Sequence, residues 1–356
     1  MSFPSSPATL AKTPWPAEDL EDVPACPACG GTSRRSWRRG LVDDVFACAP
    51  GTWSLVRCEG CAAAWLDPRP TRGSVMRAYA RYYTHAPAAE PYDWPHGIKM
   101  ALRHGYLRAR WGYAVAPAWS LGRYLLGPRR RAALDLTVRH LARPAETARL
   151  LDVGCGSGVF LARMRALGWE VQGLEPDPAA AAVATAAGID VLVGTLADAA
   201  WPDASFSAVT MSSVIEHVHD PGVALAACRR LLAPGGTLHL VTPNADALGA
   251  ERFGTHWRGL EAPRHLVLFN RRSLTRLLDA CGFTDCTFHP HFAGEWFWLV
   301  SGAMAAGLAP DDRGSLPRAM RRALGREGRA ADRQVAREPE RAEELVVTAR
   351  RAGAYA

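Results

Sequence analysis

Short apolar runs alternate with segments of helical periodicity between residues 149 and 290. The runs begin near Arg149, Val171, Phe206 and Thr237, and each ends in a glycine-rich or polar turn. Strands that alternate with helices in this way are typical of a parallel sheet covered by helices. The pattern therefore predicts an α/β domain over residues 149–290.

The remaining segments have patterns of their own. Residues 1–24 are Pro-rich and predict a disordered leader, and residues 71–148 predict a helical linker or cap. Within that cap, apolar residues recur at helical spacing in 98–111 and 134–141. Residues 291–356 predict an apolar segment followed by an Arg-rich helical tail. Periodicity does not decide whether the apolar part, 295–308, is a strand or a helix.

The first run leads into the turn Asp152-Val153-Gly154-Cys155-Gly156-Ser157-Gly158. Its G-x-G-x-G spacing differs from the G-x-G-x-x-G of dinucleotide-binding enzymes. A pyrophosphate favours backbone N–H groups with no carboxylate beside them. Asp152 instead suits a ligand that carries positive charge, such as the ammonium and sulfonium of S-adenosylmethionine. We therefore expect Asp152, Gly154, Cys155, Gly156 and Gly158 to bind this cofactor, with Asp152 at its methionine end.

The second run ends in Glu175, about twenty residues further on, where a carboxylate reaches the ribose hydroxyls of a nucleoside. Two carboxylates at the tips of adjacent strands would thus form an anionic pocket. We expect Pro176 and the turn of Thr195 and Leu196 to border the adenine. Ser212, at the end of the fourth strand, is a further candidate, and Asp198 is one for the adenine amino group.

Four motifs occur in order: LLDVGCGSG, GLEPD, VIEHVHDP and LLAPGGTLHLVTPN. With them the chain resembles the class I S-adenosylmethionine-dependent methyltransferases. The resemblance implies a Rossmann-like seven-stranded sheet and a methyl-transferring enzyme. One departure is Ser207, where the family usually has Asp, a mainly structural residue. The open alternatives are a methyltransferase fold without activity that acts as a binding protein, and a dinucleotide dehydrogenase, which the glycine spacing disfavours.

Two C-x-x-C pairs, Cys26/Cys29 and Cys58/Cys61, precede this domain. Two such knuckles around a β-like stretch are typical of a Cys₄ zinc ribbon, here predicted over residues 25–70 with hairpin strands at 42–47 and 53–57. Four thiolates leave no open position, so we expect a structural Zn²⁺. A redox pair and a disulfide framework are the alternatives. We interpret Cys48 as a packing residue and not as a metal ligand.

Two more segments, Leu66–Pro70 and Pro263–Leu274, resemble bacterial methyltransferases with such an N-terminal module. Many of these act on sugars, glycan intermediates or other secondary metabolites, so the resemblance implies a small-molecule or glycan acceptor. His217 lies just past the fourth strand and His265 past the fifth. Either could serve as general base for a hydroxyl or acidic C–H. The alternative for both is a hydrogen-bonded structural histidine.

The net charge of +7 changes this picture little. Lys12 and Lys99 are the only lysines among 42 basic residues, which favours genomic base composition over selection for phosphate binding. An RNA methyltransferase is the rival function, but the chain has no dense basic and aromatic run beyond residues 34–39. Without an apolar leader or a stretch of ~20 apolar residues, we expect a cytoplasmic protein. The apolar stretch 113–128 before Arg129-Arg130-Arg131 predicts either a helical hairpin packed on the catalytic domain, which we favour, or weak membrane-surface contact.

Overall fold

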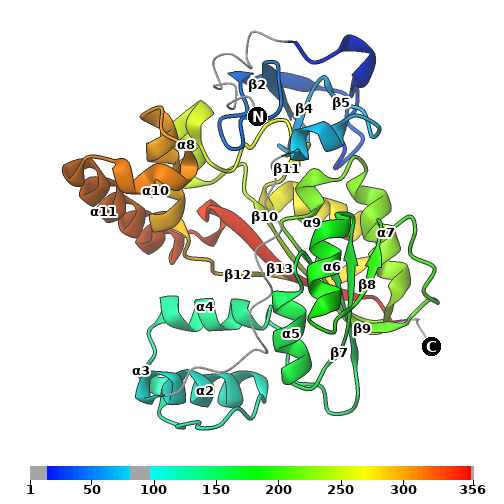
Figure 1. The fold of residues 1–356 in the computed structure, drawn as a ribbon, viewed down its shortest axis with the longest axis vertical. Coiled ribbons are helices and arrows are strands. Elements are labelled where there is room, and N and C mark those ends of the chain that lie inside the picture. The colour runs from blue at the N-terminus through cyan, green and yellow to red at the C-terminus, as the bar shows by residue number, and fades with distance from the viewer. Residues whose placement is uncertain (1–13, 81–96, 354–356) are drawn as a thin grey trace.

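A seven-stranded sheet forms the centre of the computed structural model, which describes residues 14–80 and 97–353 (Figure 1). The strand order is β12-β13-β10-β9-β6-β7-β8. The strands are β6 (Arg149–Val153), β7 (Glu170–Glu175), β8 (Asp190–Val193), β9 (Phe206–Ser212), β10 (Leu232–Pro243), β12 (Phe283–His289) and β13 (Glu344–Arg351). This confirms the predicted Rossmann-like sheet.

The strand order reverses once, between β6 and β9. From β6 the chain moves outward through β7 and β8, and it then returns to place β9 and β10 on the other side of β6, all in parallel pairing. Ligands of open α/β sheets bind at such a switch point, beyond the carboxyl ends of the strands. The fold therefore places the candidate site at the ends of β6, β7 and β9.

Helices connect the strands, and their N-termini carry the expected caps. Asp177 accepts a hydrogen bond from the Ala179 N–H before α6, and Asp220 accepts one from Val223 before α7. Asn270 and Ser273 form a reciprocal capping box at the start of α9. These helices are α5 (Val159–Ala166), α6 (Pro178–Ala186), α7 (Pro221–Leu231) and α9 (Arg271–Ala280).

The last strand, β13, comes from the tail that was predicted to be helical. It pairs antiparallel with β10 on one side and β12 on the other. Leu345, Val346 and Val347 are buried there, and this tertiary pairing overrides the Arg-rich local sequence. The helical prediction for residues 311–356 is thus wrong over 344–351, and the sheet extends beyond the predicted 149–290 domain.

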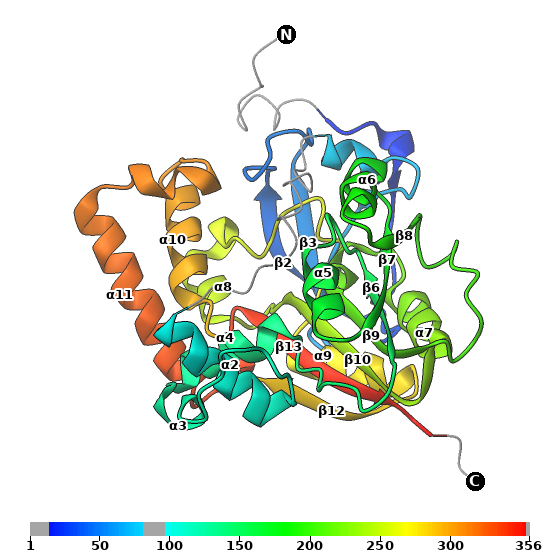
Figure 2. The same ribbon diagram turned by 60° about the horizontal axis from the view of Figure 1, so that its bottom comes forward.

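Between β12 and β13 the chain makes a helical excursion that lies beyond the edge of the sheet (Figure 2). The apolar segment left open as strand or helix is the helix α10 (Gly294–Ala305), which packs against α11 (Arg318–Val335) and α8 (Leu248–Phe253). Buried Glu343 joins this excursion to the sheet by accepting hydrogen bonds from the indoles of Trp257 and Trp298. Two short 3-10 turns, η5 (Pro310–Ser315) and η6 (Pro339–Arg341), complete the excursion, and a third, η4 (Gly254–His256), directly follows α8.

The cysteine module, residues 25–70, contains β2 (Arg34–Leu41), β3 (Trp53–Cys58) and β4 (Ala64–Leu66). The first strand lies N-terminal to the predicted 42–47, because the Asp43 carboxylate accepts the N–H groups of Phe46, Cys48 and Ala49 and folds that stretch into a loop. The predicted leader also differs in part. Residues 1–13 lie outside the described residues, but β1 (Leu20–Glu21) pairs with β5 (Arg69–Pro70).

The cysteine module and the catalytic domain share one sheet and one core. Strand β4 pairs with β11 (Val267–Leu268), which follows β10 in the chain. Trp65 on β4 is fully buried, and Arg57 forms an ion pair with Asp246. The two segments predicted as separate units therefore form one packed body around β11.

A third region, the helical cap of residues 98–141, contains α2 (Ile98–Trp111), α3 (Gly122–Leu125) and α4 (Pro128–Thr137). Helix α2 has its predicted bounds, whereas α4 ends four residues before Leu141. Tyr113 is buried and its hydroxyl accepts a hydrogen bond from the Trp169 indole, yet Trp119 and Tyr124 are exposed. No helix within residues 14–80 and 97–353 combines the length and the apolar character needed to cross a bilayer.

Candidate active site

The glycine turn after β6 approaches its neighbours closely. Gly154 and Gly156 have φ values of 71° and 53°, in the left-handed region that favours glycine. A Cβ on Gly154 would lie 2.5 Å from Val214 Cγ2, whereas one on Gly156 would have no atom within 4 Å. Gly154 thus keeps the turn against the loop after β9, and Gly156 leaves open space on its outer side.

Glu175 ends β7 beside this turn. Its carboxylate accepts hydrogen bonds from the backbone N–H groups of Gly156 (2.8 Å) and Asp177 (3.0 Å). Burial raises the pKa of this carboxyl group, and the two N–H donors partly oppose the rise. Glu175 is therefore fixed at the sheet tip predicted to hold a ribose, next to the glycine turn.

Asp152 differs from its predicted role. Its side chain is buried, it accepts a hydrogen bond from Thr210 Oγ1 (2.8 Å), and it forms an ion pair with Arg139. Burial raises the pKa of Asp152, and the Arg139 charge opposes that rise. The two predicted carboxylates are therefore accompanied by a cation, Arg139, which pairs with Asp152 and also stacks on the Phe160 ring.

The adenine candidates lie on the rim of the sheet. Pro176 and Thr195 are exposed, and Leu196 and Ser212 are partly buried. Asp198 accepts hydrogen bonds from the N–H and hydroxyl groups of Thr195, both at 2.8 Å. These residues sit at the ends of β7, β8 and β9, as predicted, while Asp198 is already engaged in its own turn.

Two other members of the glycine turn act through the backbone. Cys155 is buried, and its N–H donates to the Leu174 carbonyl. Gly158, with φ 78°, begins α5. Cys155 thus holds the turn against β7, Gly158 lies close to Ala184 of α6, and neither presents a side chain to a ligand.

The structure brings the two predicted catalytic histidines together. The rings of His217 and His265 have centroids 4.7 Å apart and are inclined by 69°. His217 lies in η3 (Ile215–His217), directly after β9. Burial lowers the pKa of both imidazoles, that of His265 to about 3, although the Glu261 charge opposes the shift. Near neutral pH both rings are therefore uncharged and can accept a proton or bind as neutral ligands.

Backbone carbonyls orient both rings. His217 Nδ1 lies 3.0 Å from the Arg264 carbonyl oxygen and 2.9 Å from the Tyr79 hydroxyl. His265 Nδ1 lies 2.8 Å from the Gly259 carbonyl oxygen. Because a carbonyl only accepts hydrogen bonds, each Nδ1 carries the proton and each Nε2 keeps its lone pair.

The segment that follows the cysteine module helps to build this cluster. Tyr79 comes from η2 (Val75–Tyr79). In the cysteine module, the Asp43 carboxylate accepts hydrogen bonds from both terminal nitrogens of the fully buried Arg264. Arg264 also donates a hydrogen bond to Glu261. Burial alone would raise the pKa of Glu261, but its cationic neighbours, Arg258 above all, hold that pKa well below its usual range. The position of the Arg264 carbonyl, and with it of His217, thus depends on a residue of the cysteine module.

The four predicted zinc ligands also meet. The Sγ atoms of Cys26 and Cys61 are 3.6 Å apart and those of Cys29 and Cys58 are 3.7 Å apart. All four lie within 4.8 Å of one another. Four Zn–S bonds of ~2.3 Å in a tetrahedron separate the sulfur atoms by roughly 3.8 Å. The donor set and its spacing therefore fit a tetrahedral Zn²⁺.

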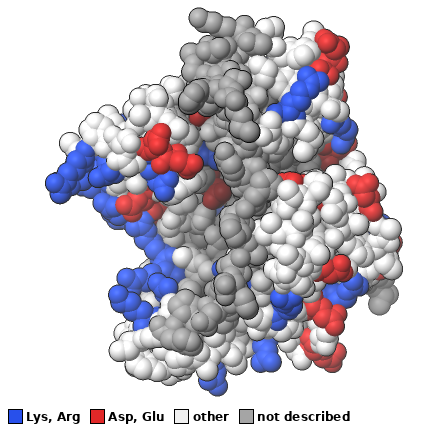
Figure 3. All heavy atoms as spheres, in the orientation of Figure 1, with Lys and Arg blue, Asp and Glu red and all other residues white. Residues whose placement is uncertain are grey.

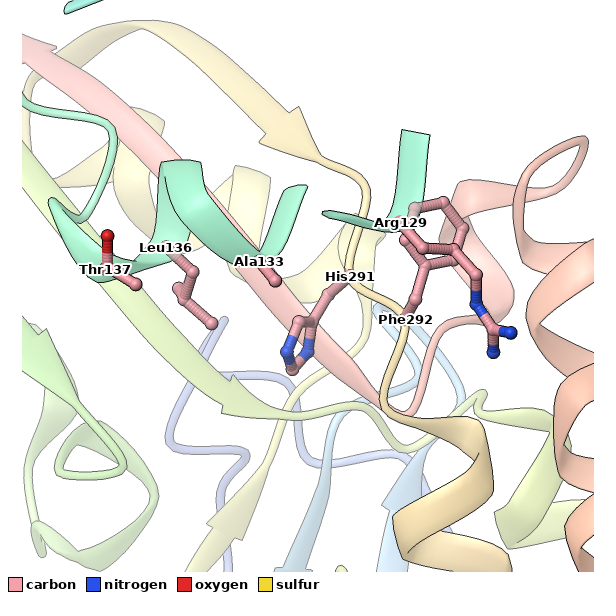
Figure 4. A pocket seen from close by; sticks show the side chains of 6 residues that line it. All are labelled: Arg129, Ala133, Leu136, Thr137, His291 and Phe292. Atoms are coloured by element: carbon pink, nitrogen blue, oxygen red, sulfur yellow. The ribbon is translucent and has the colours of Figure 1, made fainter. Parts of the chain in front are cut away.

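A cavity of about 230 Å³ lies between α4 and the connection from β12 to α10 (Figure 4). Arg129 at its margin forms an ion pair with Asp332 of α11. Helix α4, which lines one side of the cavity, ends two residues before Arg139. The residues that line the cavity are Arg129, Ala133, Leu136, Thr137, His291 and Phe292.

Charge on the visible face is uneven (Figure 3). Lys and Arg side chains gather over α11 and around α3, and the rest of that face mixes both signs.

Three residues of the site, Arg139, Tyr79 and Asp43, belong to no motif, so the sequence did not indicate them. No sequence signal pairs Arg139 with Asp152, although the distance along the chain is only thirteen residues.

The comparisons with known proteins agree with this geometry. The family described as "Methyltransferase domain" matches residues 126–287. A ubiquinone biosynthesis O-methyltransferase of Xanthomonas campestris is 36% identical over 197 residues, covering 49% of this chain and 80% of that protein. A protein of the same description from Hahella chejuensis is 32% identical over 178 residues, covering 44% and 73%. The structure of the [4+2]-cyclase SpnF is 20% identical with a TM-score of 0.47, covering 80% of this chain and 98% of that chain.

Proposed function

The chain belongs to the class I S-adenosylmethionine-dependent methyltransferases, and from that premise we propose that it methylates a hydroxyl oxygen of a small-molecule acceptor. The observation that carries the proposal is the pair of uncharged imidazoles, His217 and His265, beyond the end of β9. Hydroxyl groups are weak nucleophiles and need a proton acceptor, which sulfur or amine acceptors need less. The two relatives are both named O-methyltransferases, which supports the same acceptor atom.

The residues around the glycine turn fit the cofactor, which supplies an electrophilic sulfonium methyl group when it is bound. Glu175 would hold the ribose hydroxyls, and the open side of Gly156 gives room for the ligand. Arg139 suits the carboxylate of the methionine moiety better than Asp152 suits its ammonium, because Asp152 is already neutralised. Thr195 and Leu196 remain proposed neighbours of the adenine.

The acceptor would lie between the glycine turn and the two histidines. Val214 contacts Gly154, and His217 follows three residues later, so the cluster adjoins the methionine end of the cofactor site. His217 is only partly buried, whereas His265 lies behind it. We propose that the pair activates the acceptor oxygen through Nε2 of His217, with His265 as the positioning group.

The cysteine cluster has a structural part in this proposal. We infer that Cys26, Cys29, Cys58 and Cys61 hold one Zn²⁺, which stabilises the module that carries Asp43. Four thiolates complete a tetrahedron, so this ion would take no part in the methyl transfer.

The acceptor class divides into two groups that an assay can separate. The resemblance to methyltransferases with an N-terminal cysteine module supports sugars and glycan intermediates, and the names of the two relatives support an intermediate of ubiquinone biosynthesis. The purified chain is given S-adenosylmethionine with a tritiated methyl group and two acceptor panels, nucleotide sugars and hydroxylated intermediates of ubiquinone biosynthesis. A methoxy product, identified by mass spectrometry, is the expected result in one panel.

The matched variants are His217→Ala and His256→Ala, the second at an exposed histidine outside the cluster. We expect His217→Ala to lower kcat by about 10²–10⁴-fold, the usual contribution of a positioned general base. The affinity for S-adenosylmethionine should be unchanged, and His256→Ala should behave like the parent protein. Methylation of RNA alone, or equal kcat in both variants, would overturn the proposed acceptor or the proposed role.

A further inference from the structure

We infer that residues 119–131, here called the cap tip, bind the surface of a membrane that carries anionic lipids. The sequence left two alternatives for the apolar stretch 113–128, packing on the catalytic domain and contact with a membrane. The structure divides that stretch, because Tyr113 is buried whereas Trp119, Leu121, Tyr124 and Leu125 have exposed fractions of 47%, 57%, 64% and 63%. Large apolar side chains that gather at the surface mark a site of interaction.

The backbone keeps these side chains at the surface. The tip lies directly against α2: a Cβ on Gly105 would be 1.7 Å from the Trp119 carbonyl oxygen, and one on Gly122 would be 1.8 Å from the Leu102 carbonyl oxygen. The Trp119 N–H also donates to the Ala101 carbonyl at 2.8 Å. Because the two backbones are in contact at these glycines, the large apolar side chains of the tip have no room between the two segments.

The same region is strongly basic. Between residues 97 and 134 the sequence has eight basic residues and no acidic one. Among the residues that the structure describes, their only ion pair joins Arg129 to Asp332 of α11, a helix over which further basic side chains gather (Figure 3). A basic surface around exposed apolar side chains is complementary to anionic headgroups above a hydrocarbon layer. The eight residues are Lys99, Arg103, Arg108, Arg110, Arg123, Arg129, Arg130 and Arg131.

Arg123 and Tyr124 combine the two kinds of side chain. The Arg123 guanidinium lies over the Tyr124 ring, 4.4 Å from its centroid, and donates a hydrogen bond to its hydroxyl. Long basic and aromatic side chains at a membrane place their apolar part on the hydrocarbon and their polar end among the headgroups. Leu121 and Leu125 flank this pair in the chain and would enter the boundary of the acyl layer.

A bilayer fits the cap tip better than a second copy of the chain or a strand of RNA. In a symmetric dimer the basic residues of two tips would face one another, and like charges across an interface are unfavourable. An RNA strand would stack its bases on Trp119 and Tyr124 but would leave the leucine side chains in water. A lipid surface accommodates both the apolar and the basic side chains.

Vesicle flotation tests the inference. The purified full-length chain is mixed with vesicles of phosphatidylcholine alone or of phosphatidylcholine with phosphatidylglycerol, and each mixture is centrifuged through a density gradient. We expect the chain to float with the anionic vesicles and much less with the neutral ones. Added salt should release it, because salt screens the attraction between the basic residues and the headgroups.

Two double variants separate the apolar and the basic contributions. Leu121→Ser/Leu125→Ser should lower the partition constant for anionic vesicles by at least about tenfold, because it removes apolar surface that the bilayer would bury. Arg123→Gln/Arg130→Gln should lower it by roughly fivefold for each charge removed. Arg129 is left in place because it pairs with Asp332.

Matched controls change side chains of the same kind outside the cap. Met76→Ser/Val223→Ser removes two exposed apolar side chains, and Arg272→Gln/Arg276→Gln removes two exposed charges on α9. Both control variants should float like the parent chain. Circular dichroism and calorimetry with S-adenosylmethionine show whether each variant is folded.

The inference is overturned by a parent chain that floats with neither kind of vesicle, or with both equally. A folded Leu121→Ser/Leu125→Ser chain that floats like the parent, or a parent that binds single-stranded RNA in place of the vesicles, also overturns it. Membrane binding does not depend on the proposed function. Flotation without methylation of any hydroxyl acceptor would therefore overturn the proposed function and leave the membrane contact standing.

Discussion

The cysteine module and the helical cap both precede the catalytic domain in the chain, but they are attached to it in different ways. The module shares a sheet with the catalytic domain through β4 and β11 and buries an arginine–aspartate pair there. The cap packs on the catalytic domain through a separate, smaller apolar cluster that includes Leu107, Tyr113 and Val138. Polar contacts add to it, such as Arg139 with Asp152 and the stacked rings of His140 and His289. The first attachment is a shared sheet, whereas the second includes groups that can titrate or exchange partners.

Because they are attached differently, the two regions have different roles. A region inside the core can only stabilise and position, and the module does so for Arg264 and His217. A region that places a charged residue, Arg139, beside the glycine turn can respond to the ligand that enters there. We therefore expect damage to the module to be global and damage to the cap to be local.

The largest effect is expected from Cys58→Ser. It removes one thiolate of the cluster, and zinc sites of this kind supply a large share of the folding free energy of small domains. Because module and catalytic domain share a core, we expect the loss of a single cooperative thermal transition for the whole chain, measured by calorimetry. Cys286→Ser, at a partly buried cysteine outside the cluster, is the control. A Cys58→Ser chain that keeps the parent transition would show that the module is independent.

The second prediction concerns the buried pair of Arg264 and Asp43. Arg264→Met leaves the Asp43 carboxylate buried without its partner, which typically costs about 3–5 kcal/mol of stability. Urea unfolding of the single variant and of the double variant Asp43→Asn/Arg264→Met measures this. The double variant should recover part of the loss, because it removes the uncompensated charge. If both lose the same free energy, the ion pair is not what joins the two regions.

The third prediction concerns the cap. Arg139→Ala should raise the Kd for S-adenosylmethionine by about 10–100-fold, or ~1.4–2.8 kcal/mol, because it removes the cation beside the glycine turn. Isothermal calorimetry gives the value, and Arg143→Ala, an exposed arginine of the same loop, serves for comparison. An unchanged Kd would leave Arg139 as a purely structural partner of Asp152.

The smallest effect is a pH dependence of the cap. His140, His239 and His289 are stacked together, with Arg110, Arg139 and His291 near them. Burial lowers the pKa of His140 to about 3 and that of His289 to about 4. The folded cap thus binds fewer protons than the unfolded chain below pH 6.5. Its stability is complete above that pH and falls as the pH drops toward 4.

Hydrogen exchange at pH 7 and pH 5 tests this dependence region by region. Amides of α2 and α4 should lose protection at pH 5, while those of β3 and β4 in the cysteine module should keep theirs. His289→Gln, which cannot be charged, should reduce the difference between the two pH values. Equal loss of protection in both regions would mean that the cap and the module open together.

The sequence predicts well what depends on local pattern. The glycine turn, Glu175 and the four cysteines follow from motifs with fixed spacing, and the seven-stranded sheet follows from the family resemblance that the motifs support. The structure places Glu175 beside the glycine turn and the four cysteines beside one another. The closeness of His217 and His265 could also have been predicted, since both were expected past the ends of strands of the same sheet.

What the sequence could not predict depends on contacts between distant segments. Strand β13 lies in an Arg-rich tail and is a strand only because β10 and β12 flank it. Arg139 neutralises Asp152 from a loop without any motif. The cysteine module has the sequence of an independent domain, and only the pairing of β4 with β11 shows that it is not one.

The position of β13 bears on how the protein is made. Synthesis proceeds from the N-terminus, so β10 and β12 leave the ribosome before the strand that belongs between them. Until residues 344–351 arrive, both neighbours expose unpaired edges of the kind that promote association between chains. A premature stop codon near residue 340 would therefore remove little mass but would leave a nascent chain that is prone to aggregate and dependent on chaperones.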